Sequence, residues 1–510
     1  MRVPMADRSD GTDLCLTSWF CLGVRFAVVW VLVLVVGSAA VAEPVAVTKT
    51  NPTRLYMHYM PWFETPETLG GNRWGWHWTM NNRDPNRLAS DGRPDIASHY
   101  DPLIGPYASS DPDVIEYHLL LMKLSGVDGV LIDWYGVEGT NGDIDLLLTN
   151  SDALVAKMDD FGMEFAVVLE DRFSANVGQA QANVAYLRDH YFGNPWYIRQ
   201  GPGDDPLMMV FGPITFETQH EWQQILTHGG ENVDFLTLWY ESGDAGVMAD
   251  GEYAWPYPNG IFDPGGHLGH LDNFYRHRIP SLERAGGVAY PGFVDFYAEG
   301  GAGAGYAEIP HLDGQTLSDT LGVAAGYADD LSFVQLATWN DFGEGTIFEP
   351  TYETGFDYLE ILQGFSGVGY DVDDLELVLM LYEARKVWSG DMNKQQSLDA
   401  VASHLAALRL DEAKALLYFT AYPWLIGDAN EDGSVNLLDL SVLAANFGGV
   451  GPFEHGDGDF NADDRVDLLD LSLLAVNFGS GSIPEPSVAW GFAALAGVCL
   501  RRIRERAFFS

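Results

Sequence analysis

Cysteine is nearly absent from this chain of 510 residues. Its three cysteines stand in the terminal segments, at Cys15, Cys21 and Cys499. The long region between them therefore has no disulfide framework. It also cannot contain a cysteine nucleophile or a zinc site built from thiolates.

Basic residues are scarce. The sequence has 27 Lys and Arg against 73 Asp and Glu, which gives a formal net charge of −46 at pH 7. Such a chain repels phosphate groups, so we expect no nucleic-acid partner. Divalent cations and neutral ligands suit this charge, and much of it also keeps an exported protein soluble. Hydrophobic residues still form 47% of the sequence, and its length predicts several folded domains.

Both ends of the sequence have the features of sorting signals. An apolar run at residues 26–42 closes with Ala-Val-Ala, which predicts a secretory signal peptide over residues 1–42. An uncleaved membrane anchor is the alternative. Residues 483–510 combine Pro-Glu-Pro, a short apolar run and a cluster of arginines. This order resembles the bacterial Pro-Glu-Pro carboxy-terminal sorting signal (PEP-CTERM). The resemblance implies export, handling by a sorting machinery and membrane association at the cell surface.

Two segments before that tail are copies of one another. They read GDANEDGSVNLLDLSVLAANFG from Gly427 and GDFNADDRVDLLDLSLLAVNFG from Gly458. In each, oxygen-bearing side chains stand at positions 1, 3, 5, 9 and 12 of a loop, the spacing with which a twelve-residue loop surrounds one calcium ion. The predicted ligands are Asp428, Asn430, Asp432, Asn436 and Asp439 in the first loop, and Asp459, Asn461, Asp463, Asp467 and Asp470 in the second.

Each loop runs into an amphipathic helix, and the pair resembles a type I dockerin. The resemblance implies that residues 426–480 fold on calcium and bind a cohesin-like protein. In the second loop Asp464 stands where the first has a glycine. A solvated acidic turn is the alternative for a single loop, but two loops in register favour calcium. The histidines elsewhere lack His-Glu-x-x-His spacing, so we expect no other metal and no cofactor for catalysis.

The middle of the chain alternates short apolar runs with helical patterns. The clearest helix spans residues 111–126, with Asp111 as N-cap, Pro112 in its first turn and Gly126 at its end. Strands separated by helices predict parallel βαβ units, and a (β/α)8 barrel over residues 43–365 fits the length. A doubly wound sheet is the alternative, but no Gly-x-Gly-x-x-Gly turn follows the first strand. The strand-like runs cover residues 54–60, 127–133, 164–170, 207–211, 233–239, 287–293 and 333–339. Residues 366–425 form a helical spacer in this prediction.

Acidic and aromatic residues recur where the predicted strands end. In a barrel this is the end that carries the chemistry. Aromatic rings cover the C–H faces of sugars and carboxylates bind sugar hydroxyls, so the pattern favours a carbohydrate ligand. For any single aromatic run, packing is the alternative. The candidates by position are Trp62, Trp134, Glu170, Asp295 and Asn340, with Trp76 and His77 in the segment RWGWHW.

The segment TWNDFGEGTIFEP, residues 338–350, places Asp341 and Glu344 three residues apart among glycines. Cleavage of a glycosidic bond needs a proton donor for the leaving oxygen and a second carboxylate that acts as nucleophile or base. Repulsion between neighbouring carboxylates raises one pKa and keeps one acid protonated near neutral pH. The segment therefore predicts a catalytic pair, with a surface charge pair as the alternative.

The middle domain resembles glycoside hydrolase family 99, the endo-α-mannosidases, and more distantly the α-1,3-glucanases of family 71. The similarity lies in RWGWHW, in residues 95–136, in VVLEDRF and in TWNDFGEGTIFEPT. The final loop of family 99 reads Asn-Glu-Trp-His-Glu-Gly-Thr, with both glutamates catalytic. The resemblance implies that Glu344 serves as general acid and then base. It implies that Asp341 assists attack by the substrate's 2-hydroxyl, through an anhydro-sugar intermediate.

The same resemblance implies substrate contacts for Trp134, Glu170, Tyr290 and Asp295. The function expected from the sequence is therefore that of an exported enzyme that cleaves internal α-mannosidic bonds in a polysaccharide or glycan. One alternative is an α-1,3-glucanase-type hydrolase that inverts, with Asp341 activating water. The other is a non-catalytic carbohydrate-binding or scaffold protein that kept the barrel, since a fold alone proves no reaction.

Overall fold

The computed structural model describes residues 42–230, 232–422, 426–430, 432 and 434–479. The expected sorting segment at residues 483–510 lies outside them, as does the expected signal peptide apart from Ala42. In the described ranges, no helix combines the length and the apolar character that a membrane crossing requires.

Eight parallel strands form a closed barrel. They are β1 (Leu55–Tyr59), β4 (Gly129–Trp134), β5 (Glu164–Leu169), β7 (Asp205–Val210), β8 (Asp234–Leu238), β9 (Gly251–Tyr253), β10 (Arg284–Ala289) and β11 (Phe333–Leu336). The strands pair in the order β5, β4, β1, β11, β10, β9, β8, β7. Strand β7 also pairs with β5, which closes the ring. This confirms the predicted (β/α)8 barrel and excludes the doubly wound sheet, which would leave two edge strands unpaired.

Seven of the eight strands coincide with predicted apolar runs, because a strand buried on both faces reads as a continuous hydrophobic segment. The strand that the sequence did not reveal is β9, whose three residues Gly-Glu-Tyr contain no apolar run. It is parallel to β8 and β10. Strand β10 also starts earlier than predicted, at Arg284.

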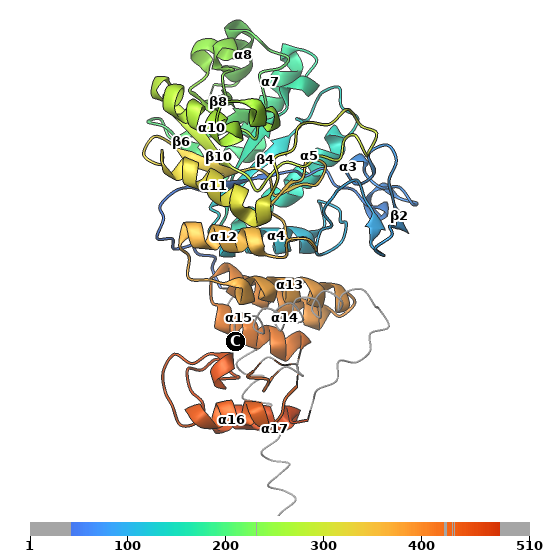
Figure 1. Ribbon diagram of the computed structural model, residues 1–510, viewed down its shortest axis with the longest axis vertical. Coiled ribbons are helices and arrows are strands. Elements are labelled where there is room, and N and C mark those ends of the chain that lie inside the picture. The colour runs from blue at the N-terminus through green and yellow to red at the C-terminus, as the bar shows by residue number, and fades with distance from the viewer. Residues whose placement is uncertain (1–41, 231, 423–425, 431, 433, 480–510) are drawn as a thin grey trace, which may run out of the picture. The chain divides into compact units, whose positions relative to one another are not determined.

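Helices surround the strands, as Figure 1 shows for α5, α7, α8, α10 and α11. The predicted helix at 111–126 is α4, in which the carboxylate of Asp111 accepts the N–H of Asp113 at 2.9 Å. The helices of the barrel region are α2 (Pro66–Leu69), α3 (Trp76–Thr79), α4 (Pro112–Leu124), α5 (Ile144–Val155), α6 (Met158–Phe161), α7 (Val177–Tyr186), α8 (Gln219–Leu226), α9 (Ser242–Ala245), α10 (Gly266–His277), α11 (Gln315–Ala325) and α12 (Asp357–Ser366). Short strands outside the barrel ring are β2 (Asp84–Leu88), β3 (Pro94–Asp95), β6 (Arg199–Gln200), β12 (Asn340–Asp341) and β13 (Thr346–Ile347).

The region after the barrel is helical, as predicted. Its helices are α13 (Val372–Val387), α14 (Met392–Ala406) and α15 (Leu410–Ala421). An ion pair joins α13 to α4: the guanidinium of Arg385 donates two hydrogen bonds to Glu116, at 2.9 and 2.8 Å. Both side chains are largely buried, at 7% and 12% exposure. Arg385 also contacts Asp399 at 2.7 Å, whose side chain is 68% exposed.

We expect Glu116→Ala to lower the free energy of unfolding by about 3 kcal/mol, because it leaves a buried guanidinium without its buried partner. Asp399→Ala removes the exposed partner of the same guanidinium and is expected to lower it by less than about 1 kcal/mol. Urea unfolding of both variants measures the difference. Equal losses would contradict the assignment of Glu116 as the main partner.

Candidate active site and calcium loops

The two acids of the predicted catalytic pair lie on one tight turn. Strand β11 leads into the hairpin of β12 and β13, and this hairpin contains both acids. The backbone N–H of Glu344 donates to Oδ1 of Asp341 at 2.9 Å. Gly345 has a φ of +65° and lies against the carbonyl oxygen of Val294, so no other residue fits there without strain. The turn holds both carboxylates beyond the C-terminal end of a barrel strand, where such folds carry their catalytic groups.

Burial raises the pKa values of the two acids to different extents. Asp341 is 4% exposed, and burial raises its pKa to about 7, although backbone N–H groups of the turn oppose the change. Burial raises the pKa of Glu344 well above its ordinary value, and the charge of Asp341 adds to the effect. The hydroxyl of Tyr297 donates to Glu344 at 3.1 Å and lowers that pKa in part. Glu344 is thus the acid that keeps its proton, and Asp341 ionises first.

The loop after β10 brings Tyr297 to this pair. The backbone N–H of Phe296 donates to the carbonyl of Gly343 at 2.8 Å, which connects the loop to the turn that contains both acids. The carboxylate of Asp295 accepts the backbone N–H of Tyr297 at 3.0 Å. Asp295, predicted as a substrate contact, therefore shapes the loop that carries Tyr297. The sequence analysis did not single out Tyr297, although it follows Asp295 by two residues.

Two further carboxylates lie at the C-terminal ends of the neighbouring strands β4 and β5. Asp133 is 2% exposed, and Glu170 forms an ion pair with Arg172 at 2.7 Å. Burial, and after it the charge of Glu170, raises the pKa of Asp133. Burial raises the pKa of Glu170 to about 7, and Arg172 opposes this. Asp133 also responds to Asp341, and Glu344 to Glu170, so the four acids influence one another.

Asp133 takes the place that the sequence analysis gave to its neighbour Trp134. Successive residues of a strand point to opposite faces. Trp134 is fully buried and stacks on Tyr186 of α7, with ring centres 6.1 Å apart, so it lies in the layer between strands and helices. The structure does not bring Trp134 together with the acids. The period of two along β4, which puts Asp133 on the face opposite Trp134, could have revealed this.

Asn340 and Tyr290, two other predicted substrate contacts, are also inside the protein. Asn340 is 0% exposed and Tyr290 is 2% exposed. The amide of Asn340 bonds to the backbone of Met60, and the hydroxyl of Tyr290 lies 3.0 Å from Nδ1 of His267. Both side chains are thus buried and hydrogen-bonded within the protein.

The predicted aromatic residues after β1 do lie together. The rings of Trp62 and His77 stack with centres 3.9 Å apart and planes 6° apart. The ring of Trp76 meets His77 edge-on at 5.0 Å and is 42% exposed. Burial lowers the pKa of His77 to about 3, so the stacked ring is neutral. Trp62 also packs against the small apolar cluster that contains Tyr135, two residues after Asp133, which connects this aromatic group to the acids.

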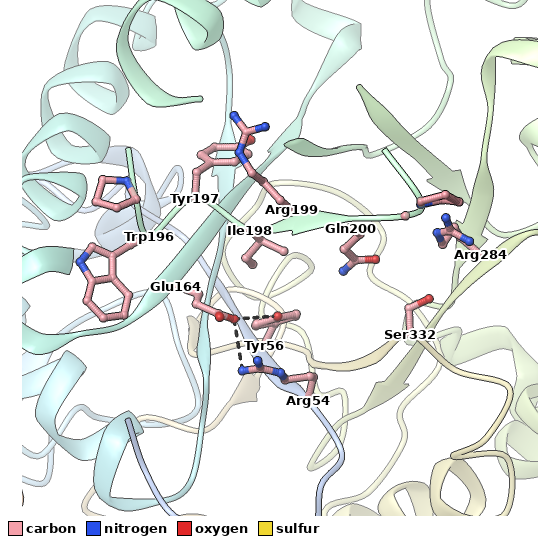
Figure 2. Close-up of a pocket in the computed structure, with 13 residues that line it drawn as sticks. Arg54, Tyr56, Glu164, Trp196, Tyr197, Ile198, Arg199, Gln200, Arg284 and Ser332 are labelled. Atoms are coloured by element: carbon pink, nitrogen blue, oxygen red, sulfur yellow. Dashed lines mark hydrogen bonds and ion pairs between the residues drawn. The ribbon is translucent and has the colours of Figure 1, made fainter. Parts of the chain in front are cut away.

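A hollow of about 680 Å³ lies at the opposite end of the barrel. Residues before or at the start of β1, β5 and β10 line it, among them Arg54, Glu164 and Arg284 (Figure 2). The hydroxyl of Tyr56 donates to Glu164 at 2.8 Å, and Arg54 contacts the same carboxylate at 3.4 Å. These contacts join β1 to β5, and we assign them to the stability of the barrel, since its N-terminal face carries no chemistry in this fold.

Residues 51–239 match the family model described as Glycosyl hydrolase family 99. The chain contains a glycoside hydrolase family 99 domain. The matched segment runs from before β1 to the end of β8 and includes Asp133 and Glu170. The turn with Asp341 and Glu344 lies beyond it, so the assignment of that pair depends on the geometry above.

Relatives of this family 99 domain include a glycoprotein endo-α-1,2-mannosidase of Xenopus laevis, 23% identical over 189 residues, which are 34% of this chain and 41% of the relative. A glycoprotein endo-α-1,2-mannosidase-like protein of Homo sapiens is 25% identical over 234 residues, which are 41% of this chain and 50% of the relative. The chain thus spans half or less of these relatives' length. A solved family 99 endo-α-mannosidase of Bacteroides thetaiotaomicron has a TM-score of 0.49 and 18% identity, over 64% of this chain and 98% of that one.

The two predicted calcium loops lie after the family 99 domain and have equivalent local structure. In both, the N–H of the residue at position 5 donates to the carboxylate at position 1, at 3.1 Å for Asp428 and 3.2 Å for Asp459. Each loop leads into one helix, α16 (Leu437–Asn446) or α17 (Leu468–Asn477). Position 12, Asp439 or Asp470, closes a capping box on the residue at position 9.

Each half of the repeat supports the other. Asn446 at the end of α16 donates to the carbonyl of Asp457, just before the second loop, at 2.8 Å. Asn477 at the end of α17 donates to the carbonyl of Ile426, just before the first loop, at 2.9 Å. Asp464, which stands where the first loop has glycine, has a φ of +61°, a conformation that aspartate tolerates better than most residues.

One buried carboxylate oxygen in these loops has no hydrogen-bond partner among the described residues. Asp428 and Asp459 are each 2% exposed, and Oδ2 of Asp459 is buried without a hydrogen-bond partner in the described part of the chain. A buried carboxylate oxygen of this kind requires a partner. Within the same residues, no group of three or more His, Cys, Asp or Glu side chains is arranged to hold a metal ion. The ligands predicted from the sequence also include asparagine oxygens.

Proposed function

We propose that this chain is an exported glycoside hydrolase that cleaves internal α-mannosidic bonds in a polysaccharide or glycan. The family 99 match over residues 51–239 supports the reaction class. The observation that carries the proposal is the pair Asp341 and Glu344, held on one turn beyond the barrel strands with pKa values that burial raises to different extents. Such a pair supplies one acid with a proton and one that ionises near neutral pH.

In the proposed mechanism Glu344 donates a proton to the leaving oxygen. Asp341, when ionised, takes the proton of the substrate's 2-hydroxyl as that oxygen attacks the anomeric carbon. Glu344 then acts as base for the water that attacks the anomeric carbon, and Asp341 returns its proton to the 2-oxygen as the anhydro-sugar opens. Tyr297 orients Glu344 through its hydrogen bond at 3.1 Å. Glu170 and the exposed ring of Trp76 are the substrate contacts that we retain.

A second candidate is an inverting α-1,3-glucanase. The side chain of Asp341 is one methylene shorter than glutamate, which leaves space for a water molecule that it could activate. An NMR time course of the anomeric products from α-mannan, α-1,3-glucan and other α-linked polysaccharides separates the two. Cleavage of α-mannan with retention supports the first proposal, and cleavage of α-1,3-glucan with inversion supports the second. Binding without cleavage would favour a carbohydrate-binding or scaffold protein.

The pH dependence of kcat/KM is expected to be bell-shaped, with its acidic limb at a pKa of about 7. The base Asp341 must be ionised, so below that pH activity falls about tenfold per unit as the group takes up a proton. The alkaline limb lies higher, because Glu344 must keep its proton and its pKa is raised further. A pH–rate profile measures both limbs. An acidic limb near 4 would contradict a buried base.

We further propose that residues 426–480 bind two calcium ions through the ten predicted ligands and dock to a cohesin-like protein. The matching loops and the unpartnered Oδ2 of Asp459 support the cation. When bound, calcium would offset the repulsion among the aspartates that the loops hold together. Export by residues 1–42 and sorting by residues 483–510 complete the proposal, and both rest on the sequence.

A further inference from the structure

A chain of buried polar groups stands directly behind the catalytic turn. Its first member is Asn340, which precedes Asp341 in the sequence. Oδ1 of Asn340 accepts the backbone N–H of Met60 at 2.9 Å, and Nδ2 donates to the carbonyl of the same residue at 3.1 Å. Nδ2 also donates to the hydroxyl of Tyr107 at 3.0 Å. All the hydrogen-bonding capacity of this amide except one lone pair is thus used to fix its position.

The chain continues from Tyr107 to helix α4. The hydroxyl of Tyr107 donates to Oε2 of Glu349 at 2.6 Å. The other oxygen of Glu349 lies 3.3 Å from Nε2 of His118, and Nδ1 of His118 lies 3.0 Å from the hydroxyl of Tyr59. Glu349 is 1% and His118 is 0% exposed. Water therefore cannot replace a lost partner in this chain without rearrangement.

We propose that Tyr107 and Glu349 are positioning residues for the hydrolytic reaction proposed above, and that they act through Asn340 to hold Asp341 in its reactive orientation. The inference rests on that proposed function. On the side of β11, the backbone N–H of Asp341 donates to Oγ1 of Thr338 at 2.8 Å. Without Tyr107, one Nδ2 proton of Asn340 loses its acceptor, and the peptide that carries Asp341 loses an anchor.

The protein offers a matched control for Tyr107 in another tyrosine. Tyr56 also donates a hydrogen bond from its hydroxyl to a glutamate, Glu164, at 2.8 Å (Figure 2). Tyr56 and Tyr107 are each 4% exposed. Tyr56 lies near the N-terminal end of β1, whereas the catalytic turn lies beyond the other end of the barrel. Removing either hydroxyl therefore deletes one tyrosine–glutamate bond of the same kind, but Tyr107 alone is connected to Asp341.

The experiment compares Tyr107→Phe with Tyr56→Phe. We expect Tyr107→Phe to lower kcat about 10- to 100-fold with KM changed less than about threefold, because small misplacement of a reacting group acts on the chemical step. Tyr56→Phe should leave both constants within about twofold. Thermal unfolding of the two variants should shift by similar amounts. Equal loss of activity in both variants, or a loss confined to KM, would overturn the inference.

A double-mutant cycle tests the order of the chain. Glu349→Gln should also lower kcat. The double variant should lose no more activity than the more impaired of the two single variants, since both residues act through Asn340. Multiplying losses would mean independent roles and would refute the relay through Tyr107.

A readout without substrate separates this inference from the proposed function. Crystal structures of the wild type and of both Tyr→Phe variants should show the Asp341 carboxylate displaced by about 1 Å in Tyr107→Phe and unmoved in Tyr56→Phe. If the wild type cleaves no α-linked glycan, the proposed function fails, while the displacement still decides whether Tyr107 positions Asp341.

Discussion

Glu344→Gln is expected to lower kcat/KM on the glycan that the wild type cleaves by about 10³-fold, within the range that general acid catalysis contributes. Glutamine keeps the shape of the side chain and its contact with Tyr297, but it cannot donate a proton to a leaving oxygen. Binding of the glycan should stay within a few-fold, because the charge-neutral amide resembles the protonated acid. Initial rates and isothermal titration calorimetry measure the two quantities.

The control for this variant is Glu308→Gln, which changes an exposed acid in the loop after β10. Its activity should equal that of the wild type. The kcat/KM of Asp341→Asn should fall by a similar factor to that of Glu344→Gln, since the reaction needs both carboxyl groups. Wild-type rates in Glu344→Gln would end the assignment of Glu344 as the acid. If these variants lost glycan binding and kept the wild-type rate of turnover, the two acids would form a sugar-binding site.

Removal of calcium is expected to unfold residues 426–479 and to leave hydrolysis unchanged. Each loop contains at least three aspartates within twelve residues, and the two halves support one another through Asn446 and Asn477. Without a cation nothing offsets the repulsion between the aspartate carboxylates. In such modules the free energy of metal binding supplies the free energy of folding. Proteolysis and circular dichroism with a chelator, and then with calcium restored, measure the change. Resistance of the region to protease in the chelator would contradict the proposal.

Single-site variants make the calcium prediction specific. Asp459→Ala removes position 1 of the second loop and should reduce the stoichiometry from two ions to one in calorimetry. Asp464→Gly is the control: it restores the residue that the positive φ of this position favours, and it should keep both ions. Two ions bound by Asp459→Ala would show that the second loop does not use this ligand.

Local patterns in the sequence predicted much of this fold. Apolar runs located seven barrel strands, and the N-cap Asp111 located the start of α4. The strand that was missed, β9, has three residues and is held in place by its neighbours. Its position is a consequence of barrel closure, which no local window contains.

The candidate site was predicted in part. Asp341, Glu344 and Glu170 lie at the C-terminal end of the barrel, as expected from their places after strands. Trp134 was predicted in the site from its place at a strand end and from the family resemblance, yet it packs beneath α7 and stacks on Tyr186. Asp133 enters the site in its place, because adjacent residues in a strand face opposite ways.

The sequence by itself determined the barrel, the turn with two acids and the spacing of the proposed calcium ligands, because each depends on residues that are near one another along the chain. The tertiary structure alone decided that Asn340 is an internal support, since its partner Tyr107 is 233 residues away. It also decided which acid keeps its proton, because burial by distant segments sets the pKa of Asp341 and Glu344. Hydrogen bonding and desolvation of this kind exist only once the chain has folded.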